Sequence, residues 1–207
     1  GTMLVSDPIH EAVFRELWTE FGLPTPDGFY ADRILGRQNQ DIFAEFLPNG
    51  IDVAALHERK EAMFRDRLPH PFPAMAGVTE LVRRAQAEGW PRAIVTNAMR
   101  KNADAMLAAI GLSDAFETIV IGEECTRGKP DPAPYLEAMR QLGVTPAESL
   151  AFEDSPSGVR AAVAAGLTTI GIRSTLDDAA LRAAGAHATL ADFTDPALAD
   201  HLPPSKD

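Results

Sequence analysis

The sequence predicts an α/β protein, with a Rossmann-like parallel-sheet core into which an all-helical domain is inserted. Two observations predict this class. From Gly77 onward, short apolar runs typical of strands alternate with helical patterns, which is the arrangement of βαβ units. Between residues 8 and 70, apolar residues recur at helical spacing only. The chain of 207 residues is long enough to bury one core and carry a small insert.

The predicted helical domain covers residues 8–70. Its first helix follows Asp7-Pro8, which we expect to act as N-cap and first-turn proline, and it carries an apolar stripe that includes Val13 and Leu17. Further helices are expected at about 30–35, 39–47 and 53–67. Three prolines between Pro69 and Pro73 form a stiff connector. The core domain is therefore expected to comprise residues 1–7 and 71–207.

The core domain is predicted to alternate strands and helices. Strands are expected at Ala93–Val95, Ile119–Ile121, Leu150–Phe152 and Thr169–Ile172. Helices are expected at Val78–Glu88, Lys101–Ile110, Pro132–Leu142, Pro156–Ala165 and Asp177–Ala184. Strands joined through helices in this way make right-handed crossovers in a parallel sheet. The last residues, 203–207, are expected to be frayed.

The composition narrows the classes of function. A formal net charge of −11 argues against phosphate-backbone binding, so we expect no nucleic-acid partner. The basic cluster Arg59, Lys60, Arg65 and Arg67 alternates with acids and is interpreted as a solvated helix face. The chain has neither a long apolar stretch nor a signal-peptide pattern, so we expect no membrane. The single cysteine, Cys125, fits a reducing cytoplasm, and we expect a cytoplasmic monomer.

Polar residues follow three of the predicted strands. Thr96-Asn97 follows the first strand, Lys129 lies in the loop after the second, and Glu153-Asp154 follows the third. Ligands bind outside the carboxyl ends of strands in an open parallel sheet, so we expect these groups to converge. Taken singly, each has a common structural explanation: a turn, a solvated lysine, or acids before a helix cap. Their combination predicts a site for a phosphate group and a cation.

Each residue type suits that chemistry. The hydroxyl of Thr96 can donate a hydrogen bond to a phosphoryl oxygen, and Lys129 supplies a charge that neutralises a phosphoryl group during transfer. Glu153 and Asp154 offer the hard oxygen ligands that Mg²⁺ prefers. The helix expected after them begins with Ser155 at its N-cap and directs N–H groups and a positive end toward the site.

Two other kinds of site are excluded by spacing. Gly122 to Lys129 superficially resembles the phosphate-binding loop of NTPases, but its glycines are separated by five residues. Pro130 follows the lysine, so the hydroxyl that would hold magnesium is missing. The histidines and Cys125 show no zinc-ligand spacing, and Cys125 is interpreted as a packing residue.

These residues resemble known motifs. Val95-Thr96-Asn97, Gly128-Lys129-Pro130-Asp131-Pro132 and Phe152–Gly158 resemble motifs II, III and IV of the haloacid dehalogenase superfamily, in order and in spacing. Gly1-Thr2 and the residues up to His10 resemble the end of motif I, which reads Asp-x-Asp-Gly-Thr in the family. The helical insert is similar to the cap of the β-phosphoglucomutase-like subgroup. The resemblance covers nearly the whole chain.

The resemblance implies phosphoryl transfer through an aspartyl-phosphate, with Mg²⁺ as the cofactor. It implies that Thr96 and Asn97 bind the phosphoryl group and that Thr96 and Lys129 are catalytic, with Lys129 offsetting charge on the nucleophile and the phosphate. It also implies that Asp154 is a ligand of Mg²⁺, with Glu153 as a ligand or support.

The resemblance further implies that the helical domain closes over the substrate. His10, Arg37 and Asn39 are the substrate-binding residues expected there, by position. The nucleophilic and the acid/base aspartate of motif I, with the strand that carries them, are expected just before Gly1. The core of the given sequence is therefore expected to be short by one strand.

We expect a Mg²⁺-dependent phosphatase acting on a small phosphorylated metabolite such as a sugar phosphate. Hydrolases and mutases share the core motifs, so a β-phosphoglucomutase-type phosphotransferase stays the alternative. The mutase subgroup carries a cap arginine where this chain has Asn39, with Arg37 two residues earlier. A phosphate-binding protein without catalysis is a third possibility if the aspartates are absent. Dehalogenation would leave Glu153-Asp154 without a role.

Phosphonate hydrolysis is a further alternative, which would need a Schiff-base lysine in the helical domain. Lys60 is the only lysine there, and its charged neighbours predict a solvated position.

Overall fold

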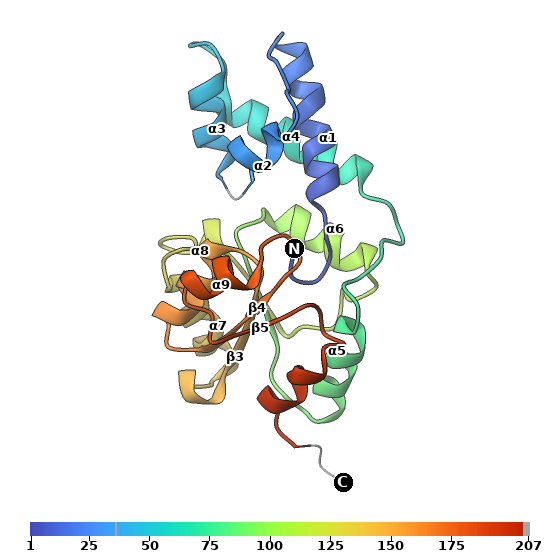
Figure 1. Ribbon diagram of the computed structural model, residues 1–207, viewed down its shortest axis with the longest axis vertical. Coiled ribbons are helices and arrows are strands. Elements are labelled where there is room, and N and C mark those ends of the chain that lie inside the picture. Colours follow the sequence, from blue (N-terminus) through green and yellow to red (C-terminus); the bar gives the residue numbers. More distant parts are fainter. Residues whose placement is uncertain (36, 205–207) are drawn as a thin grey trace. The chain divides into compact units, whose positions relative to one another are not determined.

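The computed structural model describes residues 1–35 and 37–204, and the chain forms two compact units (Figure 1). The core unit comprises Gly1–Val5 and His70–Asp207, and the helical unit comprises Ser6–Pro69. The core unit contains parallel strands alternating with helices, and the described residues of the helical unit contain helices and loops only. The predicted fold class is therefore confirmed. The last three residues of the tail expected to be frayed, 205–207, lie outside the described residues.

The helical unit consists of α1 (Asp7–Glu20), α2 (Phe29–Arg33), α3 (Asn39–Phe46) and α4 (Val53–Arg67). These helices bury a cluster of aromatic rings, in which Trp18 packs edge-on against Phe14 at 5.4 Å between ring centroids. Burial of such large rings is the main source of stability for a unit this small.

The expected N-cap of the first helix is wrong by one residue. Helix α1 begins at Asp7, and Ser6 occupies the cap position without a side-chain hydrogen bond. Pro8 tolerates this shift because the N–H groups of the whole first turn lack intrahelical partners. The Asp7 carboxylate instead accepts a hydrogen bond from the Tyr30 hydroxyl at 3.2 Å.

The core unit contains every strand and helix predicted for it, each within one residue of its expected ends. The strands are β1 (Ala93–Thr96), β2 (Thr118–Ile121), β3 (Leu150–Glu153), β4 (Thr168–Ile172) and β5 (Ala188–Leu190). The helices are α5 (Val78–Ala87), α6 (Arg100–Ala109), α7 (Ala133–Leu142), α8 (Pro156–Ala164) and α9 (Asp178–Ala183). Short 3₁₀ turns lie at Gly122–Glu124, Pro146–Glu148 and Pro196–His201. Strand β5 was not predicted, because its three residues are too few to show a pattern.

The described strands form two parallel sheets. Strand β1 pairs with β2 from Ala93↔Thr118 to Thr96↔Ile121, and β4 lies between β3 and β5. A cavity of about 930 Å³ is lined by residues of both β1 and β3. All four residues of β1 are only half-buried, since the strand borders this cavity. The strand expected before Gly1 stays a prediction.

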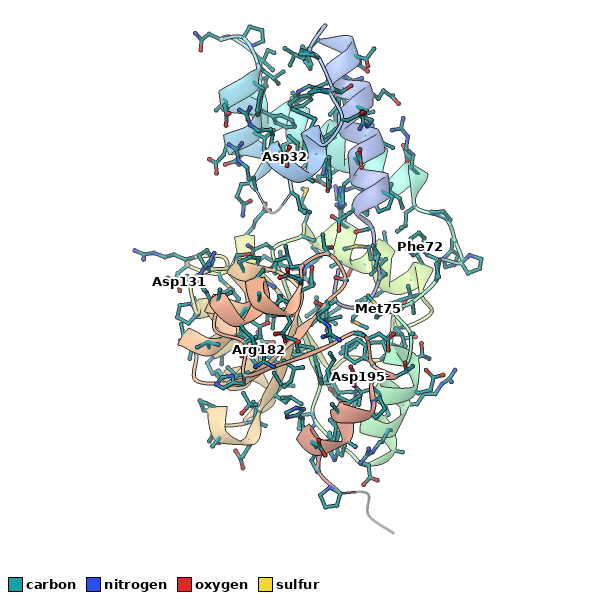
Figure 2. The ribbon with its side chains drawn as sticks, viewed as in Figure 1. Asp32, Phe72, Met75, Asp131, Arg182 and Asp195 are labelled. Carbon is teal, nitrogen blue, oxygen red and sulfur yellow. The ribbon has the colours of Figure 1, made fainter. Side chains whose placement is uncertain are left out.

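The first residues of the chain are held against the core by the connector that follows the helical unit. Phe72 and Met75 lie in this connector (Figure 2). The Met75 N–H donates to the Met3 carbonyl at 2.7 Å, and the Phe72 N–H donates to the Ala109 carbonyl at 2.8 Å. The first bond holds the segment that begins with Gly1-Thr2, and the second holds the connector to the end of α6. Within the described part of the chain, no helix has the length and apolar character needed to cross a membrane.

Candidate active site

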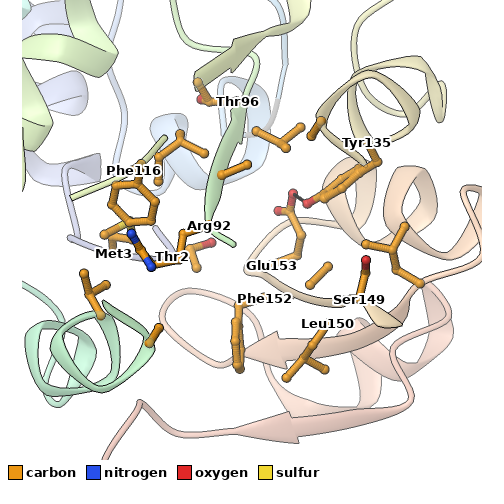
Figure 3. A pocket seen from close by; sticks show the side chains of 18 of the residues that line it. Thr2, Met3, Arg92, Thr96, Phe116, Tyr135, Ser149, Leu150, Phe152 and Glu153 are labelled. Carbon is orange, nitrogen blue, oxygen red and sulfur yellow. Dashed lines mark hydrogen bonds between the residues drawn. The ribbon is translucent and has the colours of Figure 1, made fainter. Parts of the chain in front are cut away.

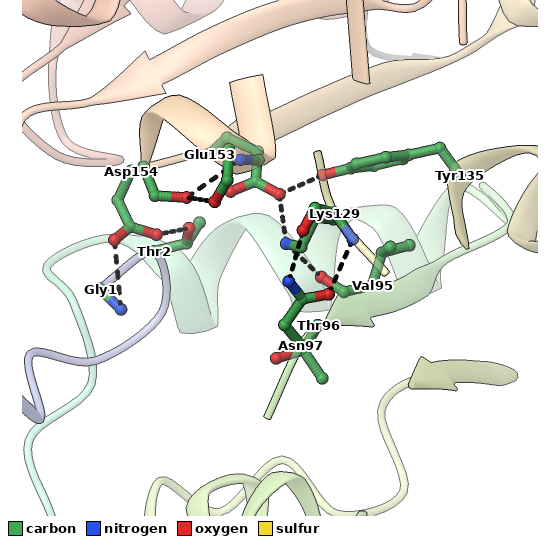
Figure 4. A network of polar contacts seen from close by, with 12 residues as sticks. Gly1, Thr2, Val95, Thr96, Asn97, Lys129, Tyr135, Glu153 and Asp154 are labelled. Atoms are coloured by element: carbon green, nitrogen blue, oxygen red, sulfur yellow. Dashed lines mark hydrogen bonds and ion pairs between the residues drawn. The ribbon is translucent and has the colours of Figure 1, made fainter. Parts of the chain in front are cut away.

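Lys129 lies at the centre of a buried polar network (Figure 4). Its Nζ donates to Glu153 Oε1 at 2.6 Å and to the Val95 carbonyl at 3.0 Å, at the end of β1. The Tyr135 hydroxyl, on α7, donates to the same Glu153 oxygen. The side chains of Lys129 and Glu153 are only 10% and 4% exposed, so the ion pair is well shielded from solvent. Burial and the Glu153 charge hold the pKa of Tyr135 well above its usual value, so its hydroxyl remains a donor.

The Asn97 side chain fixes the backbone of Lys129. Its Nδ2 donates to the Lys129 carbonyl at 2.9 Å, and its Oδ1 accepts from the Lys129 N–H at 2.9 Å. Gly122 and Gly128 both face this amide, and a side chain at either would crowd it. The Thr96 hydroxyl accepts a hydrogen bond from the Ala98 N–H at 3.0 Å and keeps its own proton for donation. Asn97 therefore positions Lys129 through its side chain, whereas Thr96 retains a free donor.

Asp154 lies beside the first residues of the chain. Its Oδ1 accepts from the Thr2 hydroxyl at 2.7 Å, and its Oδ2 lies 3.6 Å from the Gly1 nitrogen. Burial raises the pKa of Asp154, whereas the hydrogen bond from the Thr2 hydroxyl and the nearby Lys129 charge lower it. The side chain is 23% exposed and ionised at neutral pH. A Cβ at Gly1 would overlap Oδ2, so the glycine allows the carboxylate to lie directly against the backbone.

The donors at Asp154 fit a hard divalent cation better than a soft one. An ionised carboxylate oxygen is the kind of ligand that Mg²⁺ takes, together with several waters. Among the described residues, no group of three His, Cys, Asp or Glu side chains is placed to hold a metal ion. Within the described residues, Asp154 is the carboxylate best placed to hold such a cation.

Glu153 and Asp154 differ in environment although they are neighbours. Successive side chains at a strand end point to opposite sides, which separates their carboxylates. Glu153 is 3% exposed, it accepts from Lys129 and Tyr135, and a Cβ at Gly158 would overlap its carboxylate. This geometry makes Glu153 the anchor of Lys129. Its assignment as a ligand of Mg²⁺ stays a prediction, which the contacts favour less than that of Asp154.

Helix α8 begins at the same edge of the sheet. Ser155 is its N-cap and accepts a hydrogen bond from the Gly158 N–H at 3.1 Å, with Pro156 at the first helical position, as predicted. The remaining N–H groups of the first turn carry partial positive charge at this end of the helix.

The cavity extends from these polar residues along the inner edges of β1 and β3 (Figure 3). Thr96, Lys129 and Asp154 line it at the carboxyl ends of the strands. Apolar side chains such as Phe116 and Phe152 line it farther back. Thr96, Lys129 and Asp154 thus lie together at the carboxyl ends of the strands, as the order of strands and loops predicts.

The helical unit contains a second buried polar network. Lys60 is 3% exposed, and its Nζ lies 2.9 Å from both Glu61 Oε1 and His10 Nδ1. The Asn39 amide donates to Glu61 Oε1 at 2.6 Å and lies 3.1 Å from His57 Nδ1. Burial and then the Lys60 charge lower the pKa of His10 to about 3, so His10 is neutral. Since an ammonium can only donate, the His10 Nδ1 is the acceptor and Nε2 carries the proton.

This network corrects the interpretation of Lys60. The prediction of a solvated lysine is wrong, because Lys60 faces His10 and the Phe14 ring inside the unit rather than solvent. Its neighbours Arg59 and Arg67 are exposed and pair with Glu20 and Glu16, as the charge pattern indicates. Helix α4 therefore carries both buried and exposed basic residues, and the alternation of charges along the sequence cannot distinguish them.

The three substrate-binding residues predicted in the helical unit have different surroundings. His10 stacks on Phe64 with 4.0 Å between ring centroids, and Asn39 belongs to the same network as His10. Arg37 is exposed, and its guanidinium pairs with Glu45 at 2.6 Å and donates to the Arg33 carbonyl at 2.9 Å. His10 and Asn39 are thus brought together through Lys60 and Glu61, and Arg37 is held apart. Their roles toward a substrate stay predictions.

Tyr135, Glu61 and His57 belong to these networks and were not predicted as members of a site. Tyr135 follows Gly128-Lys129-Pro130 by five residues on an amphipathic helix, where a tyrosine is an ordinary core residue. Glu61 is next to Lys60 on α4, and both are buried, which the charges of this helix do not indicate.

The core and its site define the class of protein: a Rossmann-like α/β core with an inserted helical unit and a lysine, a threonine and acids at the strand ends. The chain belongs to the haloacid dehalogenase-like hydrolases, whose family model matches residues 1–172. This confirms the family that the motifs predicted.

Individual relatives are similar over most of the chain. Protein CbbY of Rhodobacter capsulatus is 34% identical over 82% of this chain and 80% of its own length. A phosphorylated carbohydrates phosphatase of Thermotoga maritima is 30% identical over 90% of this chain and 88% of its own length. The crystal structure of CbbY from Rhodobacter sphaeroides in complex with phosphate has a TM-score of 0.79 at 26% identity, covering 93% of this chain and 91% of that one.

Proposed function

We propose that this protein is a Mg²⁺-dependent phosphatase that hydrolyses a small phosphorylated metabolite. The observation that carries the proposal is the convergence of Lys129, Thr96 and Asp154 from three strand ends onto one edge of the core. A lysine and a hydroxyl donor suit the oxygens of a phosphoryl group, and the ionised Asp154 suits a cation beside it. The relatives named as phosphatases or bound to phosphate support the same chemistry.

Each residue of the site has a separate role in binding or transferring the phosphoryl group. The Thr96 hydroxyl donates to a phosphoryl oxygen, and the Lys129 ammonium balances the negative charge that develops during transfer. Glu153 and Tyr135 hold that ammonium, and Asn97 holds its backbone. Asp154 would hold Mg²⁺, which supplies charge stabilisation at the phosphoryl oxygens when bound. The aspartate expected before Gly1 attacks phosphorus and displaces the alcohol of the ester, which takes a proton from the acid/base aspartate expected beside it. Water, deprotonated by that second aspartate, then attacks the aspartyl-phosphate, so that inorganic phosphate and the free aspartate result.

Two details of the helical unit favour hydrolysis over a mutase. The amide of Asn39 is engaged by Glu61 and His57, so it does not offer a charge to a second phosphate group. Arg37, two residues earlier, is paired with Glu45 on the surface. The small phosphorylated substrate we favour is a sugar phosphate, since a relative is named as a phosphatase of phosphorylated carbohydrates.

The test is hydrolysis of p-nitrophenyl phosphate with Mg²⁺ and with chelator, followed by a panel of sugar phosphates and other small phosphate esters. We expect turnover that requires Mg²⁺ and disappears in Asp154→Asn. The exposed ion-pair variant Arg140→Met serves as the matched control and keeps wild-type turnover. Absence of metal-dependent release of phosphate from every ester would refute the proposal and favour phosphate binding alone. Interconversion of glucose 1-phosphate and glucose 6-phosphate with a bisphosphate primer would favour the mutase.

A further inference from the structure

The Lys129 ammonium uses two of its three protons within the described part of the chain. Its Nζ donates to Glu153 Oε1 and to the Val95 carbonyl, and the described residues offer it no third acceptor. An ammonium has three donors, so one N–H remains for a ligand in the cavity that Lys129 lines. How strongly Lys129 attracts a phosphate group therefore depends on how much of its charge Glu153 neutralises.

Glu153 receives a second hydrogen bond on the oxygen that faces Lys129. The Tyr135 hydroxyl donates to this same Oε1 (Figure 4). Tyr135 and Glu153 are 7% and 3% exposed, so solvent does not screen the carboxylate. In such a poorly solvated place a hydrogen bond to an ionised oxygen is stronger than in water, and it takes up part of the negative charge. The hydroxyl of Tyr135 and the ammonium of Lys129 thus share one carboxylate oxygen.

The packing of Tyr135 explains its ring but not its hydroxyl. The residue lies in the first turn of α7 and belongs to a buried apolar cluster that includes Met139 and Ala151. A phenylalanine would fill the same space in that cluster. The hydroxyl adds the hydrogen bond to Glu153, and the ring centroid lies 5.9 Å from the Lys129 Nζ. Both contacts direct the polar part of this side chain toward the lysine site.

We propose that Tyr135 is a positioning residue that sets how strongly Lys129 attracts the phosphoryl group. Its hydroxyl donates to Glu153 Oε1 and so weakens the attraction between that oxygen and the ammonium. More of the positive charge of Lys129 is then available to phosphate. Tyr135 touches neither phosphate nor the reacting atoms in this arrangement, because it acts through Glu153.

The inference rests on the proposed function only in that both place a phosphate group at Lys129. The experiment is therefore a binding measurement, titration of the protein with inorganic phosphate in the presence of Mg²⁺, followed by isothermal titration calorimetry. Wild type is compared with Tyr135→Phe, with Glu153→Gln and with the double variant, and circular dichroism checks that each is folded. The matched control is Tyr30→Phe, since this second tyrosine also donates to a carboxylate, that of Asp7, but lies in the helical unit.

We expect Tyr135→Phe to bind phosphate about five- to tenfold more weakly than the wild type, which is the size of a coupling between side chains of one hydrogen-bond network. In the Glu153→Gln background no carboxylate charge opposes Lys129, so adding Tyr135→Phe should change the affinity by less than about twofold. A hydroxyl that served only the fold would not show this dependence on Glu153. Tyr30→Phe should bind phosphate as the wild type does.

Equal phosphate affinity in wild type and Tyr135→Phe would overturn the inference. So would the same loss of affinity in both backgrounds, because the hydroxyl would then not act through Glu153, and so would a wild type that binds no phosphate. A Tyr135→Phe protein that does not fold would also overturn it, since the hydroxyl would then serve the fold. If phosphate binds and the four variants show the expected coupling but no phosphate ester is hydrolysed, the proposed function fails and the assignment of Tyr135 stands.

Discussion

Replacing Lys129 by methionine tests whether the site lysine is also a structural tie. The side chain and its partner Glu153 are 10% and 4% exposed, so the substitution leaves a buried carboxylate with one donor, the Tyr135 hydroxyl. Breaking a buried ion pair on one side costs about 3–5 kcal/mol of unfolding free energy, because the remaining charge is uncompensated. We therefore expect Lys129→Met to fold with a free energy of unfolding lower by that amount.

A second substitution separates stability from activity. In Lys129→Met combined with Glu153→Gln the charge is removed, and the glutamine oxygen can still accept from Tyr135. We expect this double variant to recover at least about 2 kcal/mol relative to the single variant, which is the coupling that a double-mutant cycle measures. Phosphatase turnover should stay at least about a hundredfold below wild type in both, since the charge that faces the phosphoryl group is absent from both.

Guanidinium unfolding followed by circular dichroism gives the stabilities, and hydrolysis of p-nitrophenyl phosphate gives the rates. Arg140→Met, in the exposed pair with Glu137 on α7, is the control and should leave both unchanged. A Lys129→Met protein as stable as the wild type would refute the structural role. A double variant no more stable than the single one would show that Glu153 is not the group left uncompensated. Wild-type turnover in either variant would remove Lys129 from the site.

Three further outcomes are expected. Lys60→Met should lower the unfolding free energy of the helical unit by about 3–5 kcal/mol, because Glu61 loses its buried partner. Unfolding is followed through the fluorescence of Trp18, and Arg59→Met on the exposed face of the helix is the control. Equal unfolding midpoints for the two variants would contradict the burial of Lys60. The pKa of His10 is lowered to about 3 in the folded state, so below pH 6.5 the unfolded chain binds a proton that the folded chain does not. Lowering the pH from about 6.5 to about 3 should therefore decrease the free energy of unfolding by up to about 1.4 kcal/mol per pH unit. His10→Gln should flatten that dependence, and an unchanged slope would show that His10 does not titrate in this way. Gly158→Ala should displace the Glu153 carboxylate and cost about 1–3 kcal/mol, whereas the exposed Arg160→Ala on the same helix should not; a fully stable Gly158→Ala would mean that Glu153 can move without loss.

The alternation of strands and helices was predictable from the sequence because each element carries its own local signal. Val78 and Val82 mark the buried face of α5, and Ser155-Pro156 marks the start of α8, so both could be placed from neighbours in the chain. Strand β5 has only three residues, which is too short for any period to appear. The position of the strand-end residues could also be predicted, since parallel strands bring their carboxyl ends to one edge.

The partners of the charged side chains could not be predicted from the sequence. The burial of Lys60 depends on His10, fifty residues earlier, and on the Phe14 ring, which no local pattern relates to it. Glu153 and Asp154 are both acidic and adjacent in the sequence, but their surroundings differ. Glu153 contacts Lys129 and Tyr135, whereas Asp154 contacts Thr2. Long-range contacts decide such roles, and spacing along the chain does not encode them.

The side chain of Asn97 imitates a peptide group. It presents one N–H donor and one carbonyl acceptor to the backbone of Lys129. Lys129 is therefore hydrogen-bonded like a residue paired in the sheet, just beyond the last pair of β1 and β2, Thr96↔Ile121. The ordering of this loop is consequently complete when the protein folds. A phosphate group arriving at the site finds a lysine whose backbone is already fixed, and binding loses none of the entropy that a mobile loop would give up. The two hydrogen bonds of the Asn97 amide thus contribute to phosphate binding by holding Lys129 in place beforehand.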